Sequence, residues 1–281
     1  MIDGLDHVVV AVRDLDAAAQ RYRALFGRQP AILAGGGARR AWFQFPNTAL
    51  ELIAPEGEGP AGDRARGWLA AGEGVAALAF RAPDLDATAK LLDRRGVPTS
   101  APAVSQLTDA HGLTHAMRAA ACDPAATGGL QVVLIGRGEP VHLPDPESEA
   151  PIAALDHVVV TTANCDRALG LYGAKLGLDL RLDRENPGWN ARQLFFRCGD
   201  AVVEIGARLG APAADRPDRF GGLAWRVKDP DAARARIAAA GFDVSEVRTG
   251  RKPGTKVFTV RDAPGGVPTL MLSSEPQHEP A

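Results

Sequence analysis

A histidine and a glutamate recur together at two places in this chain of 281 residues. His7 lies in the run LDHVVV, and the same letters return around His157. Further along, Glu51 in the run ALELIA aligns with Glu204 in the run AVVEIG. An imidazole and a carboxylate held side by side can bind a divalent transition metal, or they can form a salt bridge.

The recurring pair indicates a specific role, because burying charged side chains is energetically unfavourable. Both members fall on apolar, strand-like runs, where a charged side chain is costly unless it is paired or hydrogen-bonded. A lone histidine at the start of a strand is more often a structural residue than a ligand. The repetition favours a shared role for the two residue types, either metal binding or a salt bridge inherited by both copies. The residues alone leave these two roles open.

The whole chain is organised as an internal repeat. Residues 5–27 align with residues 155–177 without a gap, and a fainter match joins residues 74–97 to residues 222–242. Each copy follows one plan: an apolar strand, an aspartate or asparagine cap, an amphipathic helix and a glycine stop. Shorter strand-like segments follow, so each unit reads β-α-β-β-β. Four such units predict an α+β fold.

Local signals place the elements inside these units. Residues 7–12 are rich in valine, which is typical of a buried strand. Asp14 is expected to cap a helix and Gly27 to end it, and Asn164 and Gly177 hold the same positions in the third unit. Shorter strands of the first unit are expected at residues 31–33, 41–45 and 49–53.

Composition and charge restrict the class of protein. Hydrophobic residues make up 46% of the chain and charged residues 23%, which is typical of a globular protein. A formal net charge of -2, with both signs spread along the chain, disfavours a nucleic-acid partner. The three cysteines form no C-x-x-C pair, so a reducing, cytoplasmic setting is expected. No apolar run approaches the roughly 18 residues of a membrane helix, so neither export nor a membrane partner is expected.

The repeated residues make the chain resemble the vicinal oxygen chelate superfamily, which includes the glyoxalase I, bleomycin-resistance and extradiol dioxygenase families. The resemblance covers residues 2–272 and implies four modules that pair into two cups, each a curved sheet shaped as an incomplete barrel. In that superfamily, metal ligands come from the first strand, usually as histidine, and from the last strand, usually as glutamate.

The resemblance therefore implies a set of site residues. The metal ligands would be His7, Glu51, His157 and Glu204. Glu51 and Glu204 would also be the catalytic residues. The metal would be divalent iron, zinc, nickel or manganese.

The second and fourth units depart from the superfamily pattern. Their positions equivalent to His7 and His157 hold Ala77 and Gly222, and their last strands lack a carboxylate. If neighbouring units pair, each cup has one histidine and one carboxylate, fewer ligands than the ring-cleaving dioxygenases use. If the first and third units face each other, within one chain or across a homodimer, the four side chains would form a site like that of glyoxalase I.

The repeat and the proline-rich segment 139–150 predict a division into two glyoxalase-like halves joined by a linker. The expected halves, with their modules in brackets, are residues 1–138 (1–56 and 72–137) and residues 151–275 (151–209 and 219–275). Residues 276–281 are expected to form a loose tail.

Two functions are compatible with the resemblance. The first is a metal-dependent enzyme acting on a small oxygenated compound, either a lyase or isomerase of the glyoxalase type or a ring-cleaving dioxygenase. The second is a non-catalytic protein that sequesters a small molecule, as bleomycin-resistance proteins do. Ala77 and Gly222 favour the second function, because they remove two ligand positions.

Other polar residues are weaker candidates. Arg40, Arg197 and Lys252 are expected on a solvated surface rather than in an anion site. His111 and His115 are expected in a loop or strand rather than as metal ligands, because a glycine lies between them.

Overall fold

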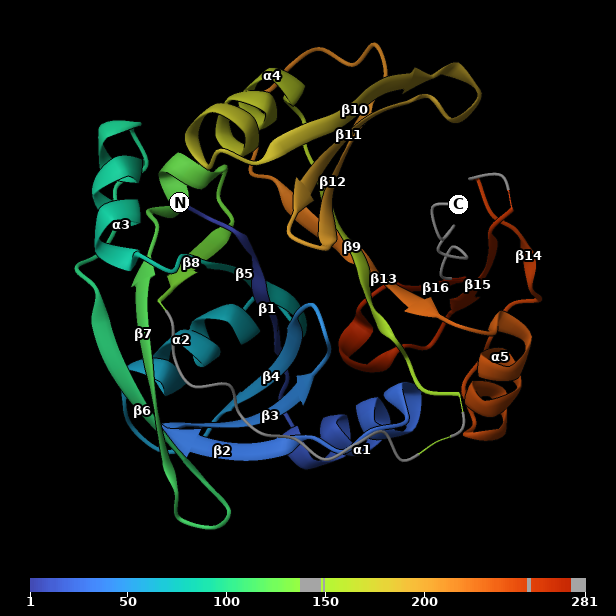
Figure 1. Ribbon diagram of the computed structural model, residues 1–281, viewed down its shortest axis with the longest axis horizontal. Helices are drawn as coiled ribbons and strands as arrows, with labels where there is room; N and C mark the ends of the chain where they lie inside the picture. The colour runs from blue at the N-terminus through green and yellow to red at the C-terminus, as the bar shows by residue number, and fades with distance from the viewer. Residues whose placement is uncertain (137–147, 149, 252–253, 274–281) are drawn as a thin grey trace, which may run out of the picture.

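The computed structural model of the chain contains two eight-stranded sheets (Figure 1). It describes residues 1–136, 148, 150–251 and 254–273. Most of the expected linker, the expected tail and Lys252 lie outside these residues. Within the described part of the chain, no helix is long and apolar enough to cross a membrane.

The first half of the chain forms a closed barrel. Its elements are β1 (Gly4–Ala11), α1 (Leu15–Phe26), β2 (Ala31–Gly35), β3 (Ala38–Gln44), β4 (Ala49–Pro55), α2 (Pro60–Leu69), β5 (Gly74–Arg81), α3 (Leu85–Arg94), β6 (Ala103–Asp109), β7 (Thr114–Ala121), η1 (Pro124–Thr127) and β8 (Gln131–Ile135). The strands follow the order β1-β4-β3-β2-β6-β7-β8-β5, and β5 pairs with β1. The predicted incomplete barrel is wrong for this half, because β2 pairs with β6 through Leu33 and Ala34 and completes the ring.

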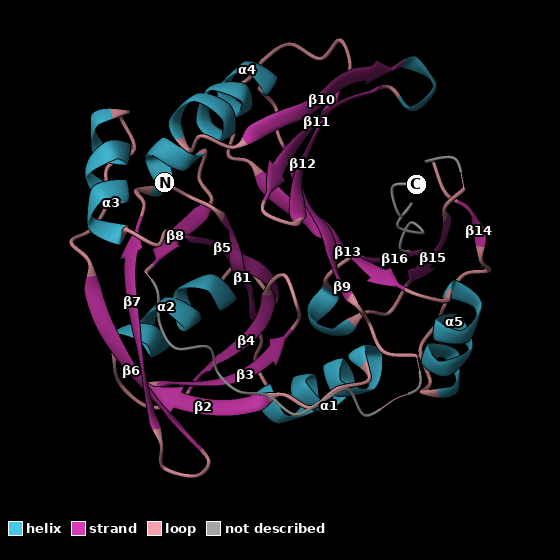
Figure 2. Cartoon of the chain, viewed as in Figure 1, coloured by secondary structure: helices cyan, strands magenta, loops and turns pink. Residues whose placement is uncertain are grey.

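The second half forms a curved sheet that does not close (Figure 2). Its elements are β9 (Ala154–Thr161), α4 (Cys165–Ala168), η2 (Leu169–Lys175), β10 (Asp179–Asn186), η3 (Pro187–Trp189), β11 (Ala191–Cys198), β12 (Ala201–Arg208), β13 (Arg219–Val227), α5 (Pro230–Ala239), β14 (Arg248–Thr249), β15 (Lys256–Val260), η4 (Pro264–Gly266) and β16 (Thr269–Ser273). The strand order is β10-β11-β12-β9-β13-β16-β15-β14, so β10 and β14 are edge strands.

Each sheet combines two neighbouring β-α-β-β-β units. β1 pairs antiparallel with β5, and β9 pairs antiparallel with β13. The four predicted units are present and the fold is α+β, as expected from the repeat. The first and third units belong to different sheets.

The predicted helix caps are present in both halves. The Asp14 side chain accepts a hydrogen bond from the backbone N–H of Ala17 at 3.0 Å. The Asn164 side chain accepts one from the backbone N–H of Arg167, also at 3.0 Å. Gly27 closes α1 in the left-handed conformation, with φ of 67°. The local signals of the repeat therefore determine where these helices begin and where α1 ends.

The helix of the third unit departs from the prediction after its first turn. Residues 165–168 are α-helical, but Leu169–Lys175 form a π-helix, where an amphipathic α-helix was expected. Gly170 and Gly173 lie in this stretch and have low α-helical propensity, which makes the wider turn less costly.

One apolar core joins the two halves. Phe26 of α1 packs against Trp225 of β13, with ring centroids 4.8 Å apart. The Asn47 side chain donates to the carbonyl of Leu155 at 2.7 Å and accepts from its N–H at 3.2 Å. The two sheets are therefore held together by both apolar packing and backbone-directed hydrogen bonds.

Candidate functional site

β1 and β4 bring His7 and Glu51 together inside the first barrel. These strands are parallel neighbours, with Val9 opposite Glu51. Nε2 of His7 lies 3.2 Å from Oε2 of Glu51, and Nδ1 of His7 lies 2.6 Å from Oδ1 of Asp6. The side chains of His7 and Glu51 are only 3% and 5% exposed. The first predicted pair is therefore formed and buried.

Arg40 of β3 completes this buried cluster. Its Nε lies 2.7 Å from Oε1 of Glu51, and its Nη1 donates to the carbonyl of Gly35 at 3.0 Å. The prediction of a solvated Arg40 is wrong, because alternate residues of a strand face the barrel interior and position 40 is one of them. Two carboxylates, one imidazolium and one guanidinium make the cluster neutral.

The cluster favours the charged forms of His7 and Glu51. Burial alone would lower the pKa of His7, but hydrogen bonds to Asp6 and Glu51 outweigh burial and raise this pKa to about 9. Burial would raise the pKa of Glu51, but His7 and Arg40 hold it below its usual value. At neutral pH a proton therefore lies between the imidazole and the carboxylate.

Helix α2 covers this cluster. Its buried residues Ala61, Ala65 and Leu69 pack with Val9 and Ala77 in one apolar cluster. Val9 shares a strand face with His7, because residues two apart on a strand point the same way. Figure 1 shows α2 within the ring of strands of the first barrel. This packing, together with the low exposure of His7 and Glu51, closes the first pair off from solvent.

The second half repeats the pair in a more open setting. Nε2 of His157 lies 3.4 Å from Oε2 of Glu204, and Nδ1 of His157 lies 2.8 Å from Oδ1 of Asp156. The side chains of His157 and Glu204 are 18% and 13% exposed. Asp156 also contacts Arg226 at 2.9 Å. Burial raises the pKa of Asp156, but His157 and Arg226 outweigh it and lower this pKa.

A neutral amide replaces the arginine of the first cluster. Gln193 on β11 lies two residues before the partner of Glu204, as Arg40 on β3 lies two before the partner of Glu51. The Gln193 side-chain nitrogen donates to Oε1 of Glu204 at 2.6 Å. Its oxygen accepts two hydrogen bonds from Arg184, at 3.2 and 3.1 Å.

Within the described parts of the chain, no helix covers the second pair. Residues 209–218, which connect β12 to β13 as α2 connects β4 to β5, contain no helix or strand. Asp218 of this connection pairs with Arg167 of α4 at 2.6 Å, on the helix-bearing side of the sheet. Val159 and Phe195, which share the face of His157 and Glu204, are only partly buried. This face of the second sheet is therefore accessible.

The four predicted ligands form two pairs rather than one site. Each histidine faces the glutamate of its own sheet. Among the residues that the structure describes, no group of three or more His, Cys, Asp and Glu side chains is placed to hold a metal. The arrangement in which the first and third units share one four-ligand site within the chain is therefore not formed.

The two pairs differ in how well they fit a divalent metal. In the first half, Arg40 already supplies a positive charge to Glu51 and α2 closes the approach, so the residues do not fit. In the second half, one nitrogen and one oxygen converge, and the neighbouring Gln193 is neutral. These two donors fit part of an open coordination shell, whose other positions water or substrate would fill.

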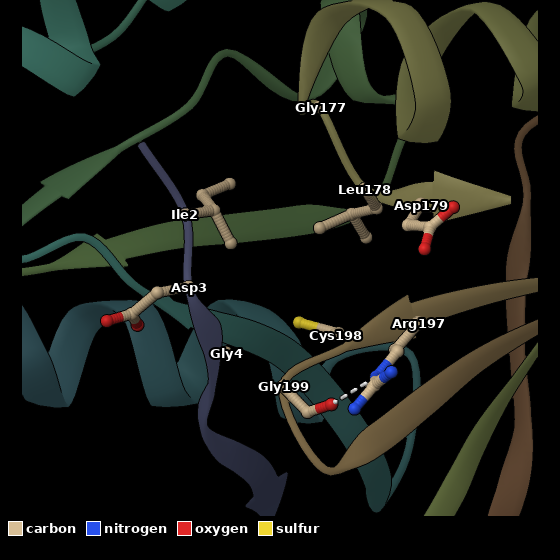
Figure 3. A pocket seen from close by; sticks show the side chains of 9 residues that line it. All are labelled: Ile2, Asp3, Gly4, Gly177, Leu178, Asp179, Arg197, Cys198 and Gly199. Carbon is tan, nitrogen blue, oxygen red and sulfur yellow. Dashed lines mark hydrogen bonds between the residues drawn. The ribbon is translucent and has the colours of Figure 1, made fainter.

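A separate cleft lies away from both pairs. It has a volume of about 420 Å³ and is lined by Ile2, Asp3, Gly4, Gly177, Leu178, Asp179, Arg197, Cys198 and Gly199 (Figure 3). Its charged groups already have partners: Asp3 pairs with Arg81, Asp179 pairs with Arg181, and Arg197 donates to the carbonyl of Gly199. The cleft contains none of the four predicted site residues.

The remaining histidine predictions agree with the structure. His111 lies in the turn between β6 and β7, and His115 lies on β7 with Nε2 3.2 Å from Asp109. The residues that sequence reasoning missed are those that surround the pairs: Asp6 and Asp156, Arg40, Gln193, and helix α2. The aspartates had a signal, because each directly precedes a repeated histidine.

Comparison with known families agrees with the repeat. Residues 5–142 match the Glyoxalase-like domain family, and residues 156–259 match the Glyoxalase/Bleomycin resistance protein/Dioxygenase superfamily. A stretch of 62 residues is 42% identical to the ethylmalonyl-CoA/methylmalonyl-CoA epimerase of Cereibacter sphaeroides. That match covers 21% of this chain and 46% of the epimerase, so less than half of that relative is matched.

Two solved structures resemble the whole chain. A triple mutant of 4-hydroxymandelate synthase from Streptomyces coelicolor matches with a TM-score of 0.69 and 14% identity, over 100% of this chain and 95% of that one. BphC, a halotolerant catechol dioxygenase, matches with a TM-score of 0.63 and 13% identity, over 100% and 91% of the two chains. At these identities the likeness shows the fold alone.

Proposed function

The chain belongs to the vicinal oxygen chelate superfamily, and on this premise we propose that it is an enzyme acting on a small oxygenated molecule at the open face of its second sheet. His157 and Glu204 are the proposed ligands of a divalent metal, and Gln193 orients Glu204. One observation carries the proposal: the same pair of side chains is sealed in the first half and accessible in the second.

The contacts around the second pair suit this role. Asp156 holds Nδ1 of His157 and so directs Nε2 toward the site. The hydrogen bond from Gln193 engages Oε1 of Glu204 and leaves Oε2 facing the imidazole. A divalent metal bound there would polarise a carbonyl of a substrate that chelates through two neighbouring oxygens.

Isomerase or lyase chemistry is favoured over ring cleavage. The ring-cleaving families that the sequence resembles usually use two histidines and one glutamate, whereas the second half offers one of each. The local match to an epimerase supports the same choice. The pair also places an imidazole nitrogen 3.4 Å from a carboxylate oxygen. Side chains of these two types serve as general bases in proton transfer at a substrate carbon.

Metal binding by paired variants tests this proposal. Glu204→Gln should lower the affinity for zinc and manganese at least tenfold, and should abolish the rise in melting temperature that these metals produce in the unchanged protein. Glu185→Gln, which removes an exposed acid of β10, is the matched control and should bind metal normally. Metal content by mass spectrometry and thermal unfolding are the measurements. Equal metal binding by both variants would contradict the assignment.

A binding protein without metal is the second candidate. It is favoured by the presence of only two donors and by apolar residues on the same face, among them Phe195 and the exposed Leu182. In that case the unchanged protein would show no melting shift with any divalent metal, while a small aromatic compound would raise its melting temperature. The same experiment therefore separates the two functions.

A further inference from the structure

Arg184 is a half-buried cation beside the second pair, and part of its hydrogen-bonding capacity is unused. Its Nε and Nη2 donate to the Gln193 side-chain oxygen. Its Nη1 has no acceptor, and the guanidinium has no carboxylate partner, among the residues that the structure describes. A guanidinium with free donors at an accessible face is suited to a planar anion such as a carboxylate.

The position of Arg184 ties it to the candidate site. Gln193 is hydrogen-bonded to Arg184 on one side and to Glu204 on the other, so the three side chains lie on one face of the sheet. They come from neighbouring strands β10, β11 and β12. Two strand spacings separate β10 from β12, about 9–10 Å. This span suits a molecule that reaches Arg184 at one end and Glu204 at the other.

Aromatic side chains line the surface around this arginine. The Arg184 guanidinium lies 5.4 Å from the ring centroid of Phe195 and 5.9 Å from that of Trp189. The guanidinium of Arg251, which follows the opposite edge strand β14, lies over the Trp189 ring, 3.7 Å from its centroid. Trp189 remains 45% exposed. The rim of the open face thus combines two cations with flat apolar surface.

The first half lacks this arrangement. Leu33 pairs with Arg40 across β2 and β3, as Arg184 pairs with Gln193 across β10 and β11. The position of Arg184 is therefore held by a fully buried leucine in the sealed half. Of these two equivalent positions, the one in the half with the accessible pair holds the arginine, which links this arginine to ligand binding rather than to the fold of the module.

We propose that Arg184 determines substrate specificity by binding the carboxylate of an aryl carboxylic acid, whose oxygenated end reaches His157 and Glu204. The inference rests on the proposed function for the position of the reacting end. The carboxylate forms a fork-to-fork contact with the guanidinium, and the ring lies against Phe195 and Trp189. Arg251 adds a second positive charge at the rim.

Metal-free protein tests the anion site independently of the metal site. The probes are benzoate, phenylacetate and 3-phenylpropanoate, each compared with its neutral amide at pH 7.5 after treatment with a chelator. At least one acid should bind saturably and at least tenfold more tightly than its amide, as measured by calorimetric titration. Arg184→Gln should remove this preference, and Arg184→Lys should restore part of it, because lysine keeps the charge but not the planar fork.

A matched control lies on the same strand. Arg181 pairs with Asp179 at 3.0 Å and is more than half exposed, so Arg181→Gln should keep the preference for the acid. Equal binding of acids and amides, no binding of any acid, or an unchanged preference in Arg184→Gln would each overturn the inference. The proposed function is tested separately, by the loss of metal binding in Glu204→Gln. Failure of the anion test would therefore overturn this inference and leave the proposed function in place.

Discussion

The two halves of the chain carry the same histidine and glutamate on equivalent strands, yet they place them in opposite environments. In the first half, Arg40 adds a guanidinium to Glu51 and α2 packs over the pair. In the second half, Gln193 takes the place of Arg40, and no helix formed by the described residues covers the face. One charged side chain and one connecting segment therefore distinguish a buried ionic cluster from an accessible pair.

This difference shows that a repeated motif does not imply a repeated function. A proton between His7 and Glu51 neutralises the first cluster, and the buried groups have no need of another cation. The second pair lacks the guanidinium and remains in contact with solvent, so a metal or a substrate can satisfy it. On the proposed function, the first pair contributes stability and the second pair contributes binding.

The largest expected difference between the halves is the loss of stability when the glutamate of each pair is replaced by glutamine. Glu51→Gln leaves Arg40 without a carboxylate partner and His7 with Asp6 alone, so one buried positive charge is uncompensated, and the free energy of unfolding should fall by about 3–5 kcal/mol. Glu204→Gln should cost about 1 kcal/mol or less, because Gln193 and solvent can satisfy the new amide. Urea unfolding followed by circular dichroism measures both values. Equal costs would show that the two pairs are equally structural.

A smaller change in the free energy of unfolding is expected when the pH is raised, because His7 in the first half loses its proton. The pKa of His7 rises from 6.5 to about 9 on folding, so its contribution to stability is complete below pH 6.5 and is lost as pH rises through 9. The loss should reach about 3 kcal/mol at most. Unfolding free energies from pH 6 to pH 9.5 should fall more steeply for the unchanged protein than for His7→Gln. Parallel curves would contradict the assignment of this proton to His7.

The sequence predicted the elements better than it predicted their environment. Asp14, Asn164 and Gly27 mark helix ends by local chemistry, and the repeat aligned them correctly. The closure of the first barrel depends on two residue pairs between β2 and β6, which are far apart in the chain and leave no local pattern. Long-range pairing of this kind cannot be inferred from periodicity.

The candidate site was predicted only in its repeated members. His7, Glu51, His157 and Glu204 stood out because they recur, whereas Arg40 and Gln193 differ between the copies and carried no signal. An arginine is usually exposed, so its burial follows from the strand face and the nearby carboxylate rather than from its type.

Helix α2 was missed because glycines obscure it. Gly62 and Gly67 weaken its helical pattern, although Pro60 at its first position and the spacing of Ala61, Ala65 and Leu69 were signals of a helix. Gly62 is needed for close packing, since a Cβ there would meet the carbonyl of Gly37. Gly62 therefore weakens the helical pattern in the sequence and, in the structure, allows α2 to pack closely against the backbone at Gly37.

Two variants of α2, with smaller expected effects than the pH dependence, test whether this helix seals the first pair. Leu69→Ala should cost about 2 kcal/mol, near the low end for a buried leucine, because the end of a surface helix can partly collapse. Amide hydrogen exchange should quicken in α2 and in β1 around His7. It should stay unchanged in β9 around His157, which α2 does not contact.

Gly67→Ala is the opposing variant on the same helix. Gly67 is exposed and an added Cβ would contact nothing within 4 Å, so alanine should stabilise α2 by about 0.5–1 kcal/mol. Exchange in α2 and β1 should therefore slow in this variant and quicken in Leu69→Ala. If β1 exchanged equally in both, α2 would not control access to His7, and the burial of the first pair would have to arise from Arg40 and the closed barrel alone.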